Sequence, residues 1–159
     1  DIVGTLTDMS LVDNDSVDAI YSSHNIEHIF THEVPIALNE FYRVLNNEGF
    51  VVITCPDIQS VGEAISQDKL YDPIYDSSMG PVTPFDILYG HRDTTVDGNI
   101  FMIHKGGFTY STLLGFFVQA GFKKWIGGRR PNNYDLFLNA CKGEKTDKEL
   151  NDLASIFLP

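Results

Sequence analysis

The stretch VDAIYSSHNIEH at residues 17–28 and the stretch FVVITCPD at residues 50–57 decide the fold. Each begins with an apolar run typical of a buried strand and ends in polar residues. Apolar side chains recur at helical spacing between them, and Pro35 falls in the expected first turn, where proline is tolerated. This order predicts a strand–helix–strand unit with parallel strands, whose functional groups belong at the carboxyl ends of the strands. We therefore expect a site at residues 22–28 and 56–57.

Turn and capping signals predict where the neighbouring elements begin and end. Residues 46–49, Asn-Asn-Glu-Gly, are expected to stop the first helix in a turn. Ser60 with Glu63 and Thr146 with Glu149 have the capping-box spacing, so each pair predicts the start of a helix.

The second half of the chain predicts one further helix and a strand pair. Residues 109–120 are expected to form a helix that ends at Gly121 and places Val118 among its inward side chains. Residues 124–127 and 135–141 are expected to form two strands separated by a turn.

Composition excludes several classes of function. The 159 residues suit one domain, and no run approaches the roughly 20 apolar residues of a membrane span. Eleven basic and 22 acidic residues give a formal charge of -11, which disfavours nucleic acid as a partner. Cys55 and Cys141 lie in expected buried strands, which suits a reducing cytoplasm rather than a disulfide framework. The chain begins at Asp1 without a visible leader, as an interior cut would.

Three blocks of residues resemble a known family. They are residues 16–28, residues 38–45, which end in Arg-Val-Leu, and residues 47–57, in which a glycine turn leads into a strand. Their order and spacing resemble the middle of class I S-adenosylmethionine-dependent methyltransferases, and residues 104–109 and 120–122 are similar to that family's last helix and hairpin. The resemblance implies an α/β fold with an incomplete Rossmann-like, mostly parallel sheet, flanking helices and a C-terminal antiparallel hairpin.

The resemblance also implies a domain organisation. Residues 1–159 would form a single truncated methyltransferase-like domain. Its parts would be a strand–helix–strand core at 17–57, an insertion or lid at 58–108, the last helix and hairpin at 109–142, and a terminal helix at 146–159. A long irregular stretch inside a compact domain is usually functional, which favours the lid.

The family pattern places candidate site residues at the strand ends. S-adenosylmethionine would be contacted by Asp8, Met9, Ser22, Ser23 and His24. The methyl acceptor, a small molecule or another unidentified group, would be contacted by His28, Asp57 and His104, one of which could act as a base. Tyr89, His91 and Tyr110 could shape the acceptor pocket. No residue is assigned as a metal ligand.

The main departure from the family is its glycine-rich loop. That loop, the first strand and the ribose-binding carboxylate should precede Asp1. We therefore expect this chain alone to bind S-adenosylmethionine weakly or not at all and to be inactive as it stands. The strand at 17–22 should also lack its inner neighbour, and we expect two chains to pair at that edge as a homodimer.

Two other classes of function stay open. His24-Asn25-Ile26-Glu27-His28 matches the His-x-x-Glu-His pattern of inverted zinc peptidases, which requires one continuous helix through the motif. The chain could also be a non-catalytic methyltransferase-like module used in binding or assembly, since fold and function separate easily.

Overall fold

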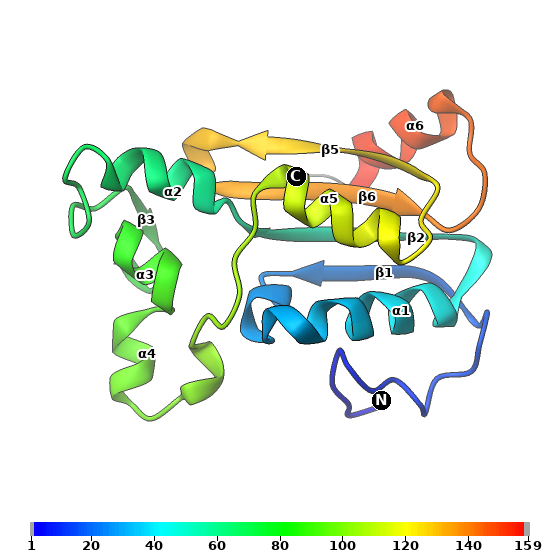
Figure 1. Cartoon of the computed structure of the whole chain (residues 1–159), viewed down its shortest axis with the longest axis horizontal. Helices are drawn as coiled ribbons and strands as arrows, with labels where there is room; N and C mark the ends of the chain where they lie inside the picture. The colour runs from blue at the N-terminus through cyan, green and yellow to red at the C-terminus, as the bar shows by residue number, and fades with distance from the viewer. Residues whose placement is uncertain (1, 158–159) are drawn as a thin grey trace.

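A computed structural model of the chain describes residues 2–157 as a central sheet covered by helices, with a smaller lobe beyond one end of its strands (Figure 1). The strands are β1 (Val17–Ser23), β2 (Leu45–Pro56), β3 (Tyr75–Ser77), β4 (Gly80–Val82), β5 (Lys124–Arg130) and β6 (Asp135–Cys141). The α-helices are α1 (Val34–Val44), α2 (Ile58–Ile65), α3 (Pro84–Tyr89), α4 (Arg92–Val96), α5 (Tyr110–Gln119) and α6 (Asp147–Phe157). Short 3-10 helices are η1 (Ile26–His28), η2 (Thr31–Glu33), η3 (Ile100–Met102) and η4 (Pro131–Asn133).

The main sheet has the strand order β1-β2-β6-β5. β1 pairs with β2 in parallel, whereas β6 is antiparallel to both β2 and β5. Three of the four strands therefore run in one direction, and the C-terminal hairpin inserts β6 against β2. This arrangement confirms the fold class expected from the sequence, including the parallel unit and the antiparallel hairpin.

β2 is longer than the sequence predicts because it contains the expected turn. Its pairing with β1 jumps from Val17 opposite Leu45 to Ala19 opposite Phe50, so residues 46–49 form a bulge inside the strand. A Cβ on Gly49 would lie 2.9 Å from the Leu45 side chain and 3.1 Å from the Val17 carbonyl oxygen. Glycine is needed there for close approach of the backbone. The helix ends before these residues, at Val44, as predicted, but they lie within β2 and not in a separate turn.

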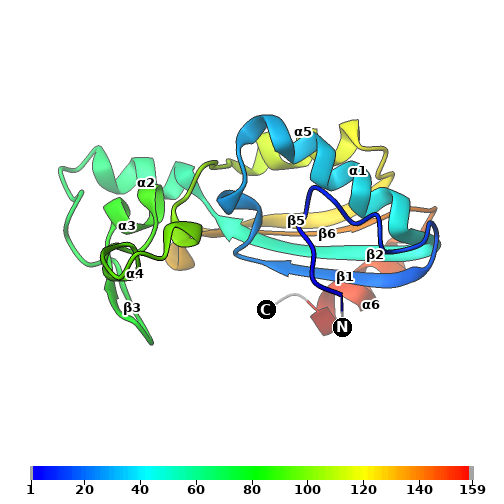
Figure 2. The same ribbon diagram turned by 90° about the horizontal axis from the view of Figure 1, so that it is seen from below.

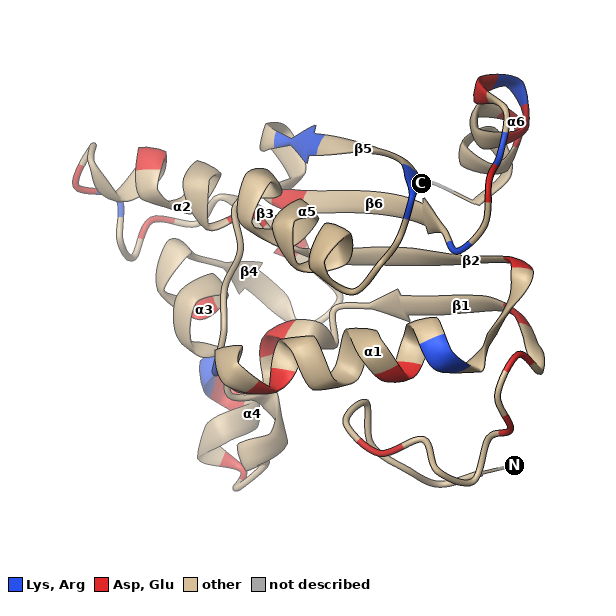
Figure 3. Cartoon of the chain, turned by 45° about the vertical axis from the view of Figure 1, so that its right-hand side comes forward, with Lys and Arg blue, Asp and Glu red and all other residues tan. Residues whose placement is uncertain are grey.

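The helices cover both faces of the sheet. α1 and α5 lie on one face and α6 on the other (Figure 2). The largest hydrophobic cluster joins α1 and α5 to the sheet, with Leu38 of α1, Ile53 of β2, Phe117 of α5 and Leu138 of β6 each inaccessible to solvent. Acidic residues are spread over the N-terminal segment, α1, α2 and α6 rather than gathered on one face (Figure 3). Within residues 2–157, no helix has the length and hydropathy to cross a bilayer.

The smaller lobe contains α2, β3, β4, α3, α4 and η3, and it lies beyond the carboxyl ends of β1 and β2 (Figures 1 and 2). Val61, Val82 and Ile87 make a second hydrophobic cluster there. Arg92 pairs with Asp86 at 2.7 Å and links α4 to α3. The lobe therefore has a small hydrophobic cluster of its own.

Two local predictions are corrected and one is confirmed. α2 begins at Ile58 with Asp57 as its N-cap, so Ser60 does not cap it; the Ser60 hydroxyl instead donates to Asp57. Val118 is 49% exposed on the outer side of α5 and does not face the core. The Thr146–Glu149 capping box is present, since each residue's side chain accepts from the other's backbone N–H.

Candidate functional site

The carboxyl ends of β1 and β2 bring the predicted residues 22–28 and 56–57 to one edge of the sheet. Ser22 pairs with Ile53 across the two strands, and Ser23 pairs with Thr54. His24 follows at φ 48°, a left-handed conformation that is uncommon for a residue with a side chain. It redirects the chain out of the strand while its N–H still donates to the Thr54 carbonyl. Such backbone strain occurs often at functional sites.

The two serines at the strand end have different environments. Ser22 is 4% exposed, and its hydroxyl has no hydrogen-bond partner among the described residues. The Ser23 hydroxyl is hydrogen-bonded to that of Thr54 at 2.8 Å. Ser22 is therefore the one with unused hydrogen-bonding capacity.

The residues after His24 form a 3-10 turn, not the helix that a zinc peptidase requires. η1 spans only Ile26–His28, and Asn25 before it is not helical. His24 and His28 are therefore not on one helix face. This conformation rules out the inverted zinc peptidase interpretation.

His28 and His104 meet although 76 positions separate them in the sequence. The Glu27 carbonyl oxygen accepts hydrogen bonds from the N–H groups of Lys105 (2.8 Å) and Gly106 (3.0 Å), which holds the end of the lobe against η1. The His28 and His104 rings then pack edge to face, with their centroids 4.8 Å apart. Burial lowers the pKa of His104 below the ordinary histidine value.

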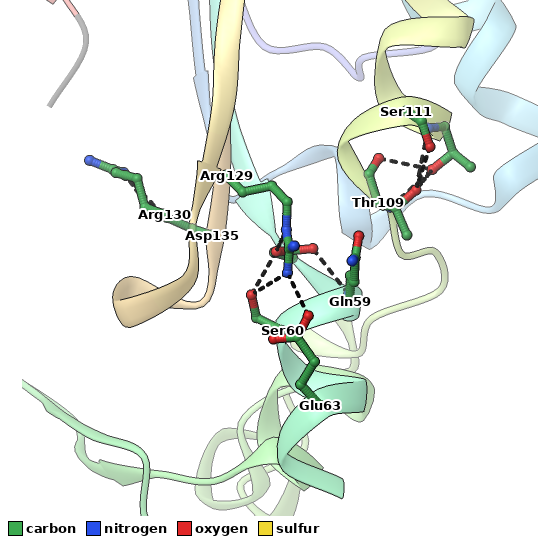
Figure 4. Close-up of polar contacts among 10 residues, drawn as sticks. Gln59, Ser60, Glu63, Thr109, Ser111, Arg129, Arg130 and Asp135 are labelled. Atoms are coloured by element: carbon green, nitrogen blue, oxygen red, sulfur yellow. Dashed lines mark hydrogen bonds and ion pairs between the residues drawn. The ribbon is translucent and has the colours of Figure 1, made fainter. Parts of the chain in front are cut away.

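Asp57 lies in a different environment from the two histidines. It is inaccessible to solvent, and its carboxylate accepts from the Gln59 N–H at 3.0 Å and the Ser60 hydroxyl at 2.7 Å. Arg129 reaches across from β5 to Ser60 and Glu63 of α2 (Figure 4), and its Nε lies 2.6 Å from the Asp57 carboxylate. The first two contacts cap the start of α2 and the third joins that cap to β5, so the geometry gives Asp57 a structural role.

The predicted cofactor residues Asp8 and Met9 lie in an N-terminal segment that is tied to α1. Arg43 donates to the backbone carbonyls of Met9 and Val12, both at 2.8 Å, and Glu40 accepts from the Met9 N–H at 2.8 Å. Hydrogen bonds from Ser10 hold the pKa of Asp8 below its ordinary value, so the carboxylate is charged at neutral pH.

Two cavities flank the loop that follows β1. The first, the N-terminal cavity, measures about 540 Å³ and is lined by residues 2–6 and 8–12 together with Asn25 and Ile29. The second, the histidine cavity, measures about 240 Å³ and is lined by His24, Glu27 and His28 on one side. Asn25 and Ile29 thus line one cavity and His24, Glu27 and His28 line the other, so the loop forms the wall between them.

The lobe closes the other side of the histidine cavity. Asp86, His91, Thr94 and His104 line it from the lobe, and Tyr134 lines it from the hairpin. Within residues 2–157 its lining includes Pro56 but not Asp57, Tyr89 or Tyr110. Of the three residues expected to shape an acceptor pocket, the structure therefore brings His91 to the cavity.

Glu27 is the residue of the cavity whose environment the sequence did not predict. Its side chain is 1% exposed, and neither carboxylate oxygen accepts a hydrogen bond from any described residue. His24 makes the nearest charged contact, with Nδ1 3.4 Å from Oε1, and this contact raises the pKa of His24. The sequence shows a Glu-His pair at this position, but it does not show that the Glu27 side chain is buried.

Sequence comparison finds one related family. Residues 1–53 match the family model described as a methyltransferase domain. A search of curated proteins found none with a significant sequence match.

Several solved structures share this fold, and some of them are described as methyltransferases. A Thermotoga maritima S-adenosylmethionine-dependent methyltransferase, described as a possible histamine N-methyltransferase, is 14% identical with a TM-score of 0.51, over 87% of this chain and 61% of its own. A Pyrococcus horikoshii protein is 14% identical with a TM-score of 0.57, over 88% of this chain and 57% of its own. Human N-acetylserotonin methyltransferase, in complex with S-adenosylmethionine, is 11% identical with a TM-score of 0.50, over 89% and 33%. This chain thus spans between a third and about three fifths of these proteins.

Proposed function

We propose that this chain belongs to the class I S-adenosylmethionine-dependent methyltransferase family and supplies the acceptor side and part of the cofactor side of a methyl-transfer site. The observation that carries the proposal is the loop after β1, which separates the N-terminal cavity from the histidine cavity. A methyl donor bound in one cavity and a methyl acceptor bound in the other would meet at the carboxyl ends of the strands. Ligands of open α/β sheets bind at these ends.

The N-terminal cavity fits the adenine end of S-adenosylmethionine. Its volume of about 540 Å³ falls in the usual range of about 300–1,000 Å³ for small-molecule sites. Asp8 is a charged acceptor suited to an exocyclic amine, and Met9, Leu11 and Ile29 offer apolar contact to a ring. These residues would hold adenine, while Ser22, Ser23 and His24 would lie nearer the sulfonium group. The bound cofactor would supply an electrophilic methyl group.

The histidine cavity is the proposed acceptor site, with residues 58–108 as its lid. His28 and His104 line it and would contact the acceptor, together with His91 from the lid. Asp57 would act at a distance, by fixing the start of α2 and hence the lid. The cavity of about 240 Å³ suits a small molecule or one protruding group of a larger one.

Titrating S-adenosylmethionine into 15N-labelled chain tests the cofactor site even when binding is weak. We expect amide shifts at residues 4–12 and at Asn25 and Ile29, and weaker binding by this chain than by a longer form that includes the family's glycine-rich loop. Methionine alone serves as the control ligand, because it lacks the adenine. Shifts confined to other regions, or identical shifts with methionine, would contradict the placement and favour a non-catalytic module.

We also propose that two copies of this chain pair through β1. Within the described residues β1 is an edge strand, hydrogen-bonded only to β2, and Tyr21 at its centre is 69% exposed. An exposed apolar edge favours pairing with another strand. Light scattering should give the mass of a dimer, and Tyr21→Lys should yield a monomer while Val118→Lys, on the outside of α5, should not. A monomeric parent chain at high micromolar concentration would contradict this proposal.

The proposed compartment is the cytoplasm. Cys55 and Cys141 are both free and buried, which suits a reducing environment. Immediate alkylation of the protein extracted under denaturing conditions should label both thiols, whereas a disulfide-bonded fraction would argue for another compartment.

A further inference from the structure

The histidine cavity holds three potential metal ligands side by side. Glu27, His28 and His104 each offer one ligand atom, and these atoms lie within 4.8 Å of one another. Two of the residues come from η1 and the third from the far end of the lobe, so the cluster exists only in the folded chain. Two imidazoles and one carboxylate are a common ligand set for catalytic zinc, which keeps a further position open.

Both histidines use the same ring nitrogen to fix their orientation. His28 Nδ1 lies 3.2 Å from the Ile103 carbonyl oxygen, and His104 Nδ1 lies 2.6 Å from the Ile87 carbonyl oxygen. A carbonyl oxygen can only accept, so each Nδ1 must be the donor. Each Nε2 is then left as the second nitrogen, with no hydrogen bond to it from the described residues. A histidine that donates one N–H to a carbonyl and offers the other nitrogen is the usual arrangement around bound metal.

Glu27 gives the independent sign of a missing partner. A carboxylate that is 1% exposed and accepts no hydrogen bond from the described residues is costly, because burial removes its water without replacement. The His24 imidazole at 3.4 Å reaches only one of its oxygens. A cation bound between Glu27 and the two histidines would satisfy the carboxylate.

The backbone holds this cluster together before any ion binds. The carbonyl of Glu27 accepts from Lys105 and Gly106, and the His104 N–H donates to the Tyr89 carbonyl at 3.3 Å. Gly90 allows this approach: at φ 97°, a Cβ there would lie 2.1 Å from the Met102 carbonyl oxygen. The segment that carries His104 is thus fixed against both η1 and α3.

We propose that Glu27, His28 and His104 bind a divalent transition-metal ion, with Zn²⁺ as the best match. Zinc bonds of about 2.1 Å place tetrahedral ligand atoms about 3.4 Å apart. The three ligand atoms lie within 4.8 Å of one another, so movements of about 1 Å at most bring them to that spacing. All three residues line the histidine cavity. If the proposed function holds, the ion would orient an acceptor oxygen or nitrogen and lower its pKa.

Calorimetric titration of Zn²⁺ alone into metal-free chain tests the site without any methyl donor. We expect one ion per chain, and a loss of affinity of at least tenfold in His104→Ala and in Glu27→Gln. His32→Ala is the matched control, because His32 is exposed and outside the cluster, and it should bind as the parent does. Mg²⁺, which prefers oxygen ligands, should bind more weakly than Zn²⁺.

The metal-free stability of Glu27→Gln separates a ligand from a structural residue. Glutamine removes the buried charge at constant shape, so this variant should melt no lower than the parent without metal yet should not be stabilised by Zn²⁺. The parent and His32→Ala should both melt at higher temperature with Zn²⁺. The proposal is overturned if the parent binds no Zn²⁺, if Glu27→Gln and His104→Ala bind it as tightly as the parent, or if Glu27→Gln melts lower than the parent in the absence of metal. Because the readouts are metal binding and melting, they are independent of whether methyl transfer occurs.

Discussion

Replacing Arg129 should destabilise the fold more than replacing any exposed basic residue. Its guanidinium is the charged partner of Asp57, which has no solvent exposure, and the Nε to carboxylate distance is 2.6 Å. Arg129→Met keeps most of the apolar stem and leaves the Asp57 charge buried without its cation. Uncompensated buried charges of this kind cost about 3–5 kcal/mol.

The contacts around the pair place the expected cost near the lower end of that range. Asp57 keeps its hydrogen bonds from Gln59 and Ser60, and Arg129 is itself 26% exposed. We therefore expect Arg129→Met to lower the free energy of unfolding by about 3 kcal/mol. Asp57→Asn should cost less, about 2 kcal/mol, because asparagine remains a good N-cap and Arg129 can still pair with Glu63.

Urea unfolding followed by circular dichroism measures these differences. The control is Lys148→Met, which removes an exposed pair with Asp152 on α6 and should change stability by about 1 kcal/mol or less. The double variant Asp57→Asn with Arg129→Met should cost less than the sum of the single variants, since each removes the same interaction. If Arg129→Met is no worse than Lys148→Met, the pair does not hold α2 to the sheet.

Three further predictions concern the core, the acid range and the thiols. Leu38→Ala should cost about 2–5 kcal/mol in urea unfolding, whereas Val118→Ala on the exposed side of α5 should cost far less; equal costs would contradict the assigned core. Hydrogen bonds from Thr146 lower the pKa of Glu149, so its contribution is present above the unfolded pKa and is lost as pH falls through the folded one. Between about pH 6 and 3, where carboxylates titrate, Glu149→Gln should therefore lose less stability than the parent. An equal loss of stability in the two proteins would contradict the cap. Burial raises the pKa of Cys55 well above its ordinary value, so alkylation should require unfolding, and labelling of the native chain would contradict that burial.

The strands and helices of the main sheet could be predicted because their patterns are local and strong. The apolar runs of β1 and β2 and the helical spacing of α1 are each visible within about a dozen residues. Residues 46–49 look the same as a turn in sequence, and only pairing with Val17 shows that they form a bulge. Ser60 has the spacing of a capping residue, but Asp57 takes the cap because it follows directly on β2.

The site could be predicted only in part, since its decisive contacts are long-range. The position of His28 at the end of β1 follows from strand topology. Its contact with His104 depends on the carbonyl of Glu27 and on the path of the lobe, for which the sequence has no periodic signal. The ion pair of Asp57 with Arg129 spans 72 positions of the sequence. Because the sequence does not show this pair, it predicts only a candidate catalytic role for Asp57.

Calorimetric titration of S-adenosylmethionine into the protein made from its complete reading frame tests the central claim most directly. Asp8→Ala should weaken binding by about tenfold or more, the equivalent of one lost charged hydrogen bond of about 1.5–3 kcal/mol. Asp18→Ala is the matched control, because Asp18 is an exposed carboxylate on β1 outside the N-terminal cavity, and it should bind as the parent does. Equal affinities for the parent and Asp8→Ala, or no binding by the parent, would contradict the assignment of the N-terminal cavity to the cofactor.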